Sequence, residues 1–380
     1  MLKAMKKIRE LELNENDEES DSGSDSDEHN VAEIDRLFCD CICINETLIR
    51  KNEYVLHVDA TRESNPNVVA TLSDHSCVVY NIHGNQVAKI EDFTEHTNNI
   101  IDCRFSSGNN NLIYTGASDG VVKLWDIRTP NKSVINFTDT TVENGKDQKP
   151  FNCFDISCND RLLAAGTDLS GGDSFLLFWD TRSKKLLGGY WESHTDDITQ
   201  VKFHPDDTNK LISGSTDGLI NVYDLSQTCE DDALIECLNT ESSIEQLTWF
   251  EKNKNYSISC ITHTSDLQLW NTDDAEPYKR INRAELAKEI KKKSEDYIYM
   301  ATSHQGKNCL VILVGSNFGN GECLRGLLVK DKKIHPYIGF KKNKQRIRCS
   351  WYNPDVNILL SGGENGILNC WRVKEDAMVV

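Results

Sequence analysis

The sequence lacks the features that mark a secreted or membrane protein. Its densest apolar run, CLVILV at 309–314, is far shorter than the roughly 20 residues of a membrane-spanning helix. No apolar leader with a cleavage site precedes the 14 cysteines, which form no C-x-x-C pair, and no lipidation signal follows Val380. We therefore expect reduced thiols in an intracellular protein of the cytoplasm or nucleus, without a membrane partner.

Positive charge is also in short supply. The chain has 42 Lys/Arg against 60 Asp/Glu, a formal net charge of -18 at pH 7. An acidic excess disfavours general binding to nucleic acid and favours solubility and basic protein partners.

Much of the acidity lies in the first thirty residues, which carry ten Asp/Glu and four Lys/Arg. The run ENDEESDSGSDSDE at 15–28 is too polar to bury a core, so residues 1–33 are predicted to form a disordered leader. Ser22 and Ser24 each have Asp three residues later, which makes them candidate phosphorylation sites for acidophilic kinases. A plain solubilising tail is the alternative.

What the chain does have is a repeated unit. The stretch HTDDITQVKFHPDDTNKLISGSTDGLINVYDL at 194–225 shares its order of features with EHTNNIIDCRFSSGNNNLIYTGASDGVVKLWDIR at 95–128. In each, His precedes an alternating strand, and Asp-Gly joins the next two strands. Because Asp-Gly allows both central residues of a turn to take positive φ, it predicts a tight hairpin. Each unit is therefore predicted to be an antiparallel meander.

Aromatic anchors of the third strand set the number of units. They fall at Tyr80, Trp125, Trp179, Tyr223, Trp270 and Trp371. The last spacing, 101 residues, is about twice the others, so a degenerate sixth unit is predicted at 295–329 and the total is seven. Five anchors have Asp or Asn six residues earlier, whereas Asp266 lies only four residues before Trp270, which predicts a shortened fifth hairpin.

With a period of 40 to 50 residues and Trp-Asp endings, the chain resembles the WD40-repeat family from about Phe38 to Val373. The resemblance implies an all-β, seven-bladed propeller, which we place at 34–375 with a short tail at 376–380. It also implies that an N-terminal strand closes the ring. The segment FCDCICIN at 38–45 has the alternation for that role.

The same resemblance implies that His, Ser or Thr, Asp and an aromatic residue form a hydrogen-bonded set inside a blade. The matching structural tetrads are His96, Thr115, Asp119 and Trp125, and then His194, Ser213, Asp217 and Tyr223. A Ser-His-Asp catalytic system would occur once beside an open cleft, so its duplication favours a structural role. We expect no enzyme activity and no cofactor.

Cys39, Cys41 and Cys43 alternate along the predicted closing strand, so all three thiols would share one face. Such a row could suggest a soft-metal site, but no other Cys or His supplies the usual Zn ligand spacing. We expect buried core thiols and no metal.

Two WDxR boxes end neighbouring units at Arg128 and Arg182. They resemble the box by which some propellers, as substrate receptors, dock on the adaptor of cullin-RING ubiquitin ligases. Guanidinium groups can fork onto carboxylates or carbonyls of a partner. A local salt bridge is the alternative.

The stretch KDKKIHPYIGFKKNKQRIR at 330–348 has eight Lys/Arg and one Asp. Tyr337 and Phe340 between its charges could stack on single-stranded nucleic acid, although the acidic chain disfavours this. Contact with the acidic leader and a solvated loop are the alternatives. A further segment at 279–293 is predicted to form a short helix between the fifth and sixth blades, with Leu286 and Ile290 on one side.

Together these patterns predict a monomeric, non-enzymatic scaffold that binds other proteins. The alternatives are a cullin-RING substrate receptor and an acidic chaperone or escort for a basic client. Candidate partner-binding residues are those that enter first strands on the top face, namely Asn98, Asp196, Asp197 and Arg346.

Overall fold

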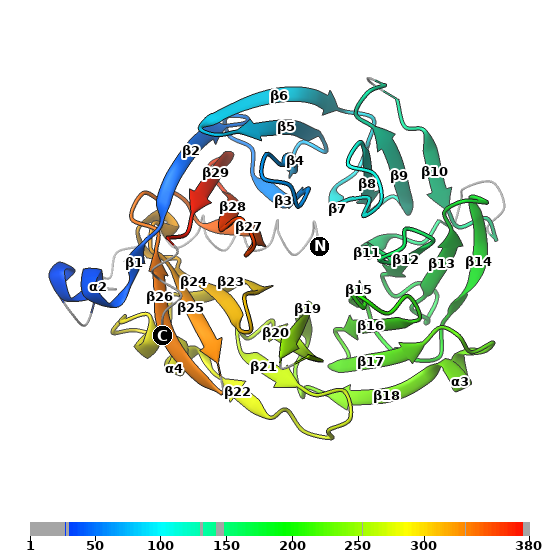
Figure 1. The fold of residues 1–380 in the computed structure, drawn as a ribbon. Coiled ribbons are helices and arrows are strands. Elements are labelled where there is room, and N and C mark those ends of the chain that lie inside the picture. Colours follow the sequence, from blue (N-terminus) through cyan, green and yellow to red (C-terminus); the bar gives the residue numbers. More distant parts are fainter. Residues whose placement is uncertain are drawn as a thin grey trace, which may run out of the picture.

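In the computed structural model the chain forms a closed ring of seven antiparallel sheets around a common axis (Figure 1). The all-β, seven-bladed fold is therefore confirmed. The structure describes residue 27 and residues 30–129, 132–141, 148–252, 254–330 and 332–374. Nearly all of the predicted leader, with Ser22 and Ser24, and the 376–380 tail lie outside the described residues.

Each blade is a four-stranded meander whose first strand lies nearest the axis. Blade one comprises β3 (Val55–Ala60), β4 (Asn67–Leu72), β5 (Cys77–His83) and β6 (Gln86–Phe93). Blade two comprises β7 (Ile100–Phe105), β8 (Leu112–Ala117), β9 (Val121–Asp126) and β10 (Ile135–Thr138). Blade three comprises β11 (Phe151–Ile156), β12 (Leu162–Thr167), β13 (Leu176–Asp180) and β14 (Lys185–Tyr190). Blade four comprises β15 (Ile198–Phe203), β16 (Lys210–Ser215), β17 (Leu219–Asp224) and β18 (Leu234–Asn239), with the short helix α3 (Glu230–Ala233) before β18.

The remaining three blades follow the same order along the chain. Blade five comprises β19 (Ile244–Lys252), β20 (Asn255–Thr262), β21 (Leu267–Trp270) and β22 (Lys279–Ile281). Blade six comprises β23 (Ile298–Gln305), β24 (Leu310–Ser316), β25 (Leu324–Lys330) and β26 (Lys333–Gly339), with the 3-10 turn η2 (Phe318–Gly321) between β24 and β25. Blade seven comprises β27 (Ile347–Asn353), β28 (Ile358–Gly363), β29 (Ile367–Arg372) and the N-terminal strand β2 (Ile42–Leu48).

The hairpin between the second and third strands differs from the prediction in two ways. Gly120 has φ of 79°, but Asp119 is absent from the residues with positive φ, so only one residue of the Asp-Gly pair is left-handed. His75 in blade one and Ser265 in blade five occupy the same place, with φ of 67° and 60°. Both lie five residues before their aromatic anchor, as Gly120 does. The prediction of a shortened fifth hairpin was therefore wrong, because the turn keeps its length with Thr264 in place of Asp.

Blade six forms where the gap between anchors predicted it, and it extends to Gly339. In the other blades the aromatic anchor pairs with an aliphatic residue near the start of the second strand, as Trp125 pairs with Ile113. The matching residue in blade six is Leu328, which pairs with Val311. An aliphatic side chain thus replaces the anchor, which explains why the sequence pattern is weak there.

The closing segment serves two blades instead of one. The two residues of β1 (Cys39–Asp40) pair in parallel with Ile338 and Gly339 of blade six. After Cys41 the chain crosses to blade seven, where β2 pairs antiparallel with β29. Closure by an N-terminal strand is confirmed, but its bounds move from 38–45 to Ile42–Leu48.

The core lies in the seams between neighbouring blades. The first-strand cysteines Cys153 and Cys349 are buried and donate to the carbonyls of Ile198 and Val55 in the next blade. The predicted helix forms as α4 (Arg283–Glu289), and Leu286 and Ile290 beside it are fully buried between blades five and six. Among the described residues, no helix is long and apolar enough to cross a membrane.

Candidate functional site

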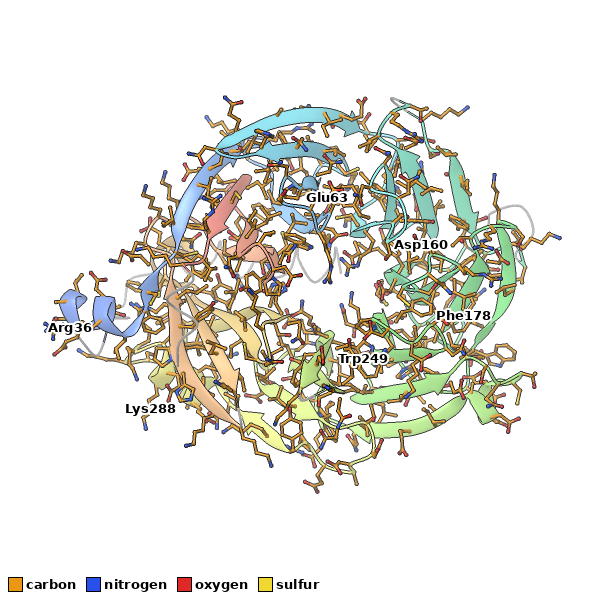
Figure 2. The ribbon with its side chains drawn as sticks, viewed as in Figure 1. Arg36, Glu63, Asp160, Phe178, Trp249 and Lys288 are labelled. Carbon is orange, nitrogen blue, oxygen red and sulfur yellow. The ribbon has the colours of Figure 1, made fainter. Side chains whose placement is uncertain are left out.

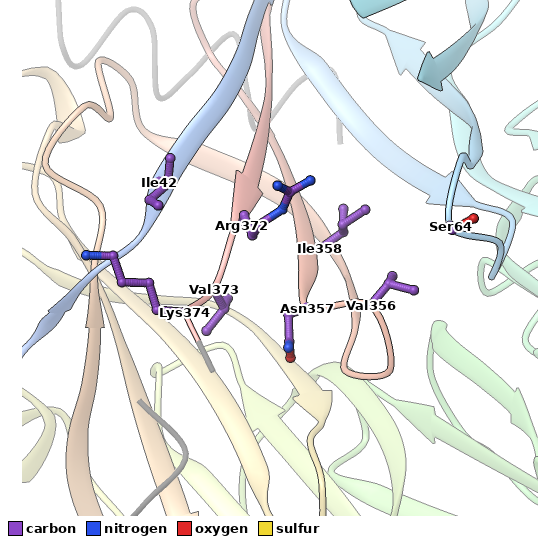
Figure 3. Close-up of a pocket in the computed structure, with 8 residues that line it drawn as sticks. All are labelled: Ile42, Ser64, Val356, Asn357, Ile358, Arg372, Val373 and Lys374. Atoms are coloured by element: carbon purple, nitrogen blue, oxygen red, sulfur yellow. The ribbon is translucent and has the colours of Figure 1, made fainter. Parts of the chain in front are cut away.

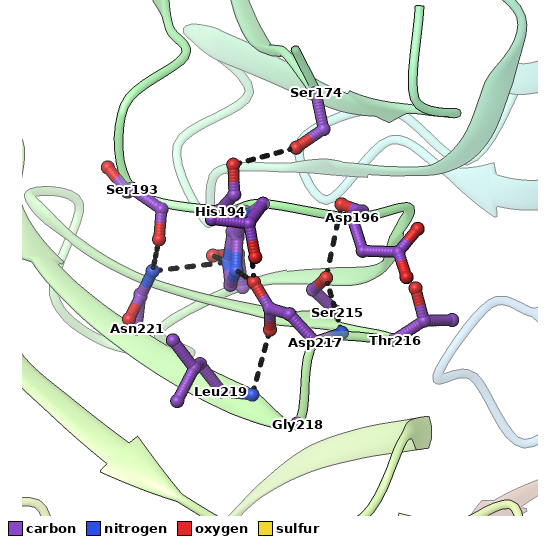
Figure 4. A network of polar contacts seen from close by, with 12 residues as sticks. Ser174, Ser193, His194, Asp196, Ser215, Thr216, Asp217, Gly218, Leu219 and Asn221 are labelled. Carbon is purple, nitrogen blue, oxygen red and sulfur yellow. Dashed lines mark hydrogen bonds and ion pairs between the residues drawn. The ribbon is translucent and has the colours of Figure 1, made fainter. Parts of the chain in front are cut away.

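The polar set of blade four forms one connected network (Figure 4). Nδ1 of His194 donates to Oδ2 of Asp217 at 3.0 Å, and its Nε2 lies 2.7 Å from the Ser213 hydroxyl. The Tyr223 hydroxyl lies 3.3 Å from the same Ser213 oxygen. Backbone amides of Thr195 and Leu219 also donate to Asp217, at 3.0 and 2.9 Å. This network joins the loop before β15 to both strands of the β16–β17 hairpin.

Blade two has the same residue types but a shorter network. The Trp125 indole donates to Thr115 Oγ1 at 2.7 Å, and His96 Nε2 lies 2.6 Å from that oxygen. The His96 Nδ1 and Asp119 Oδ1 atoms are buried without a hydrogen-bond partner among the described residues. Within the described part of the chain, the side chain of Asp119 accepts one hydrogen bond, from Thr97 at 3.4 Å. The structure thus brings three of the four tetrad residues together and leaves Asp119 apart.

Neither set has the surroundings of a hydrolase site. Ser213 is fully buried and His194 is 4% exposed, so no substrate carbonyl can reach the hydroxyl. Burial alone would raise the pKa of Asp217, but the hydrogen bonds from His194 and the two amides outweigh it and lower the pKa. A carboxylate fixed in this way orients His194 and holds strands together.

A second charged set, the axial cluster, joins the innermost strands of blades one to four. Asp102 of β7 contacts Arg104 at 2.7 Å in its own strand, Lys202 of blade four at 3.8 Å and His57 of blade one at 3.9 Å. Arg104 also lies 3.5 Å from Asp155 of blade three. Burial alone would raise the pKa of Asp102, but Arg104 and Lys202 lower it. The acidic and basic side chains of the axial cluster are largely paired with one another, so the cluster links the four blades.

At one end of blades two to four, several carboxylates have no Lys or Arg partner among the described residues. They lie in the loops between second and third strands and in the loops that enter first strands. This acidic face comprises Asp119, Asp168, Asp173, Glu192, Asp196 and Asp197. None of the six pairs with Lys or Arg among the described residues, because Lys123 and Lys149 nearby already pair with Glu95 and Asp139. Burial, and then the neighbouring Asp197, raise the pKa of Asp168.

The four predicted top-face residues do not form one patch. Asn98, Asp196 and Asp197 lie at the entrances to blades two and four, where Asp197 accepts from the Leu169 amide at 2.7 Å. Arg346 enters blade seven instead, stacks over Tyr299 at 5.1 Å and lies 3.7 Å from Glu364. Three of them therefore belong to or adjoin the acidic face, and Arg346 lies at a separate place on the ring.

The WDxR arginines lie at the opposite ends of the blades, just after β9 and β13. Arg128 forks onto Asp126 of its own blade, with nitrogen to oxygen distances of 2.9 and 2.6 Å. Arg182 is exposed, and among the described residues its guanidinium has no ion-pair partner. The local salt bridge thus holds for Arg128, while Arg182 is free to contact a partner.

The row of three cysteines is broken by the crossing of the N-terminal segment. Cys39 is exposed on β1, Cys41 is buried and Cys43 is half-buried. The expectation of three buried thiols was therefore wrong for Cys39, because the chain leaves one sheet edge for another between them. The described residues contain no group of three Cys, His, Asp or Glu side chains placed to hold a metal ion.

The basic stretch at 330–348 comprises β26, the start of β27 and the loop between them, in which Lys341, Lys342 and Lys344 are exposed. Tyr337 and Phe340 are 4% and 3% exposed, so the hypothesis that they stack on nucleic acid was wrong. Lys341 pairs with Asp35 and Asp40, each at 2.9 Å. The acidic partners come from the N-terminal segment that crosses blades six and seven, including the helix α2 (Val31–Leu37). In Figure 2, Arg36 of α2 and Lys288 of α4 lie at the outer rim of this part of the ring.

Sequence patterns missed two features of these sites. Trp371 donates to Ser361 at 2.8 Å, a pair with the same ten-residue spacing as Thr115 and Trp125. A shallow cavity of about 440 Å³ lies beside the end of β29, lined by eight residues that include Ile42, Asn357 and Arg372 (Figure 3). Of these eight described residues none is Asp, Glu, His or Cys, so the lining offers no general base or nucleophilic thiol.

Comparison with known proteins agrees with this architecture. Residues 61–305, more than half of the chain, match the family model described as nucleolar protein 10-like, N-terminal domain, a β-propeller. The WD repeat-containing protein 89 homolog of Dictyostelium discoideum is 28% identical, over 84% of this chain and 82% of its own length. An uncharacterized WD repeat-containing protein of Saccharomyces cerevisiae is 30% identical, over 77% and 72%. The GATOR2 complex protein WDR24 of Danio rerio is 25% identical over 51% of this chain and 24% of its own length.

The similarity to the WD repeat-containing protein 89 homolog extends over most of both chains. The blade-four network, the ring closure and the extent of the family match lead to the same conclusion. The chain belongs to the WD-repeat β-propellers, within the family of nucleolar protein 10-like N-terminal domains.

Proposed function

We propose that the chain is a non-enzymatic scaffold whose acidic face binds a basic segment of a client protein. WD-repeat propellers generally bind other proteins, and the relative WDR24 is named as a member of a complex. The observation that carries the proposal is a set of six carboxylates on adjoining loops of blades two to four that have no Lys or Arg partner in the described part of the chain.

The electrostatics of this face favour a cationic ligand. Burial, and then the charge of Asp197, raises the pKa of Asp168, which shows that the two carboxylates lie close together. Like charges held together destabilise the unbound state, so a Lys or Arg placed between them gains more than it would beside one carboxylate. Complementary charge also raises association rates.

The test compares two triple variants with equal change in charge. Asp173→Asn/Asp196→Asn/Asp197→Asn removes charge from the acidic face. Asp231→Asn/Glu236→Gln/Glu276→Gln removes the same charge from exposed positions elsewhere on the ring. Affinity purification from the native cell at low and moderate salt, followed by mass spectrometry, should recover basic clients with wild type and the control variant but not with the acidic-face variant.

Salt gives a second criterion, because exposed charge pairs weaken as the Debye length shortens from about 10 Å at 0.1 M to 3 Å at 1 M. Recovery of basic clients with wild type should fall as salt rises. Equal recovery with all three proteins, or equal loss in both variants, would exclude the acidic face as the binding site.

A cullin-RING substrate receptor is the second proposal, and Arg182 favours it. This arginine is exposed and free of ion pairs among the described residues, at the ends of the blades opposite the acidic face. A propeller can therefore present an adaptor surface and a client surface at once. Purification of Arg128→Ala/Arg182→Ala should lose a ligase adaptor that wild type retains, whereas retention of the adaptor would reject this docking mode.

A further inference from the structure

We propose that three lysines in and just after α4, called the α4 lysines below, bind the acidic run of this same chain, residues 15–26, which precedes Asp27. These α4 lysines are Lys288, Lys291 and Lys293. They lie on the rim of blade six, away from the acidic face, so the proposal is independent of client binding. The contact would cover a basic surface on a chain that is acidic elsewhere.

Asp27 is the point at which the acidic run joins the described part of the chain. Its two carboxylate oxygens lie 3.0 and 3.1 Å from the guanidinium nitrogens of Arg325, which is 9% exposed. A paired guanidinium fork of this kind is among the stronger ionic contacts in proteins. Asp27 also forms an antiparallel bridge with Lys292. Because this bridge is antiparallel, it directs the backbone at Asp27 toward Lys293, a direction that would place the acidic run alongside the α4 lysines.

The described part of the N-terminal segment already forms ion pairs in which its carboxylates contact basic residues of the ring. Beyond the two contacts of Lys341, Glu46 pairs with Lys344 at 2.8 Å. Phe38 is 2% exposed, and the Arg325 guanidinium lies 5.4 Å from its ring, so the segment is fixed by apolar burial as well as by charge. The run at 15–26 would extend an existing contact.

Blade six supplies a matching surface. From Lys279 to Arg348 the chain has 17 Lys/Arg and 6 Asp/Glu, against the acidic balance of the whole protein. Lys288 and Lys293 are exposed, and none of the three α4 lysines has an ion-pair partner among the described residues. They are therefore available to further carboxylates.

Reach and tethering favour an intramolecular contact. A residue of extended chain spans about 3.3–3.6 Å, so Asp25 and Asp21 can reach the α4 lysines from the anchor at Asp27. Individual surface ion pairs contribute only about 0–1 kcal/mol, but a short tether gives an effective concentration of about millimolar. Phosphate on Ser22 or Ser24 would add charge to the same run and strengthen the contact.

Cleavage of the full-length chain by a glutamate-specific protease tests the proposal. Cleavage after Glu18 and Glu19 should be slow in wild type at low salt and several-fold faster at 0.5 M salt. Lys288→Gln/Lys291→Gln/Lys293→Gln should be cleaved at low salt as fast as wild type at high salt. The matched control Lys51→Gln/Lys184→Gln/Lys185→Gln, at exposed positions in other blades, should behave as wild type. Equal cleavage rates in all three proteins at low salt would overturn the proposal.

Carbodiimide coupling, which joins a carboxylate to a lysine amine with loss of water, identifies the partner lysines. A mixture of unlabelled and ¹⁵N-labelled chains separates coupling within a chain from coupling between chains. Within-chain links from residues 15–26 to the α4 lysines would support the proposal. Links mainly between chains, or spread equally over Lys51, Lys184 and Lys185, would overturn it.

Discussion

At the residue scale, the hydroxyl ten residues before the anchor is the common element of three blades. Thr115, Ser213 and Ser361 each meet an indole N–H or a phenol within 3.3 Å. A buried indole or phenol needs a polar partner, and a small hydroxyl on the neighbouring strand supplies one without enlarging the core. In two of these blades a histidine, His96 or His194, also contacts the hydroxyl. In blade four alone of these three, an aspartate, Asp217, accepts a hydrogen bond from that histidine.

Asp217 and Asp119 occupy equivalent positions with unequal hydrogen bonding, so their replacement by alanine should have unequal effects. Asp217→Ala leaves His194 and two backbone amides without their acceptor, which should lower the free energy of unfolding by about 1–3 kcal/mol. Asp119→Ala removes one long bond from Thr97 and should cost about 0.5 kcal/mol or less. Urea denaturation measures both; equal losses would contradict the structural role of the blade-four network.

Two histidines, the buried His96 and the half-buried His304, predict sensitivity to acid. Burial lowers the pKa of His96 to about 3 and that of His304 to about 4, from an ordinary value of 6.5. As the pH falls below about 6.5, these histidines take up protons in the unfolded chain before they do so in the folded chain. The contribution of the neutral histidines to the free energy of unfolding is therefore complete above about pH 6.5 and is lost as the pH falls toward 4. The free energy of unfolding, measured by urea at several pH values, should decrease less steeply in His304→Gln. The exposed His83→Gln should keep the wild-type slope.

At the scale of elements, second-strand glycines set how closely neighbouring blades approach. A Cβ on Gly362 of β28 would lie 2.8 Å from Cβ of Val55 in blade one and 2.9 Å from the Cys349 sulfur. Gly166 and Gly214 face the next blade in the same way, at Ile198 and Ile244. Each glycine therefore creates the space into which the first strand of the following blade packs.

Gly362→Ala should push blade seven away from blade one and lower the free energy of unfolding by about 1–3 kcal/mol, the usual cost of overpacking. Gly339→Ala in β26 is the matched control, because its Cβ would meet only Phe38, at an ordinary 3.4 Å. The midpoint of urea denaturation should shift for the first variant and not for the second. An unshifted midpoint for Gly362→Ala would show that the seam can widen without cost.

The sequence predicted what local chemistry determines. Alternation, the hairpin turns and the aromatic anchors depend on residues close in the chain, so the number of blades and the place of the sixth could be predicted. Contacts between distant segments could not. The axial cluster, the burial of Tyr337 and Phe340, and the division of the closing segment all depend on side chains that come from different blades. Single-sequence patterns carry no signal for such pairs.

At the scale of the whole molecule, the N-terminal segment holds the ring closed. A chain without residues 1–48 loses β2 and the buried ring of Phe38, whose removal alone is comparable to a large core truncation of about 3–5 kcal/mol. We expect a loss of at least that size and association through the freed edge of β29. A chain without residues 1–26 should stay within about 1 kcal/mol of wild type, because the contact proposed for the acidic run consists of surface ion pairs. Urea denaturation and size-exclusion chromatography measure both effects.

The pairing of β2 with β29 also sets an order of events during synthesis. The two strands are about 320 residues apart in the chain, so at ribosomal rates of about 5–20 residues per second the first waits roughly 15 to 65 seconds for the second. Until then its backbone edge is open to any neighbouring nascent strand. The polypeptide must therefore complete its ring after the seventh blade leaves the ribosome, and crowded polysomes are where mispairing between copies should be most frequent.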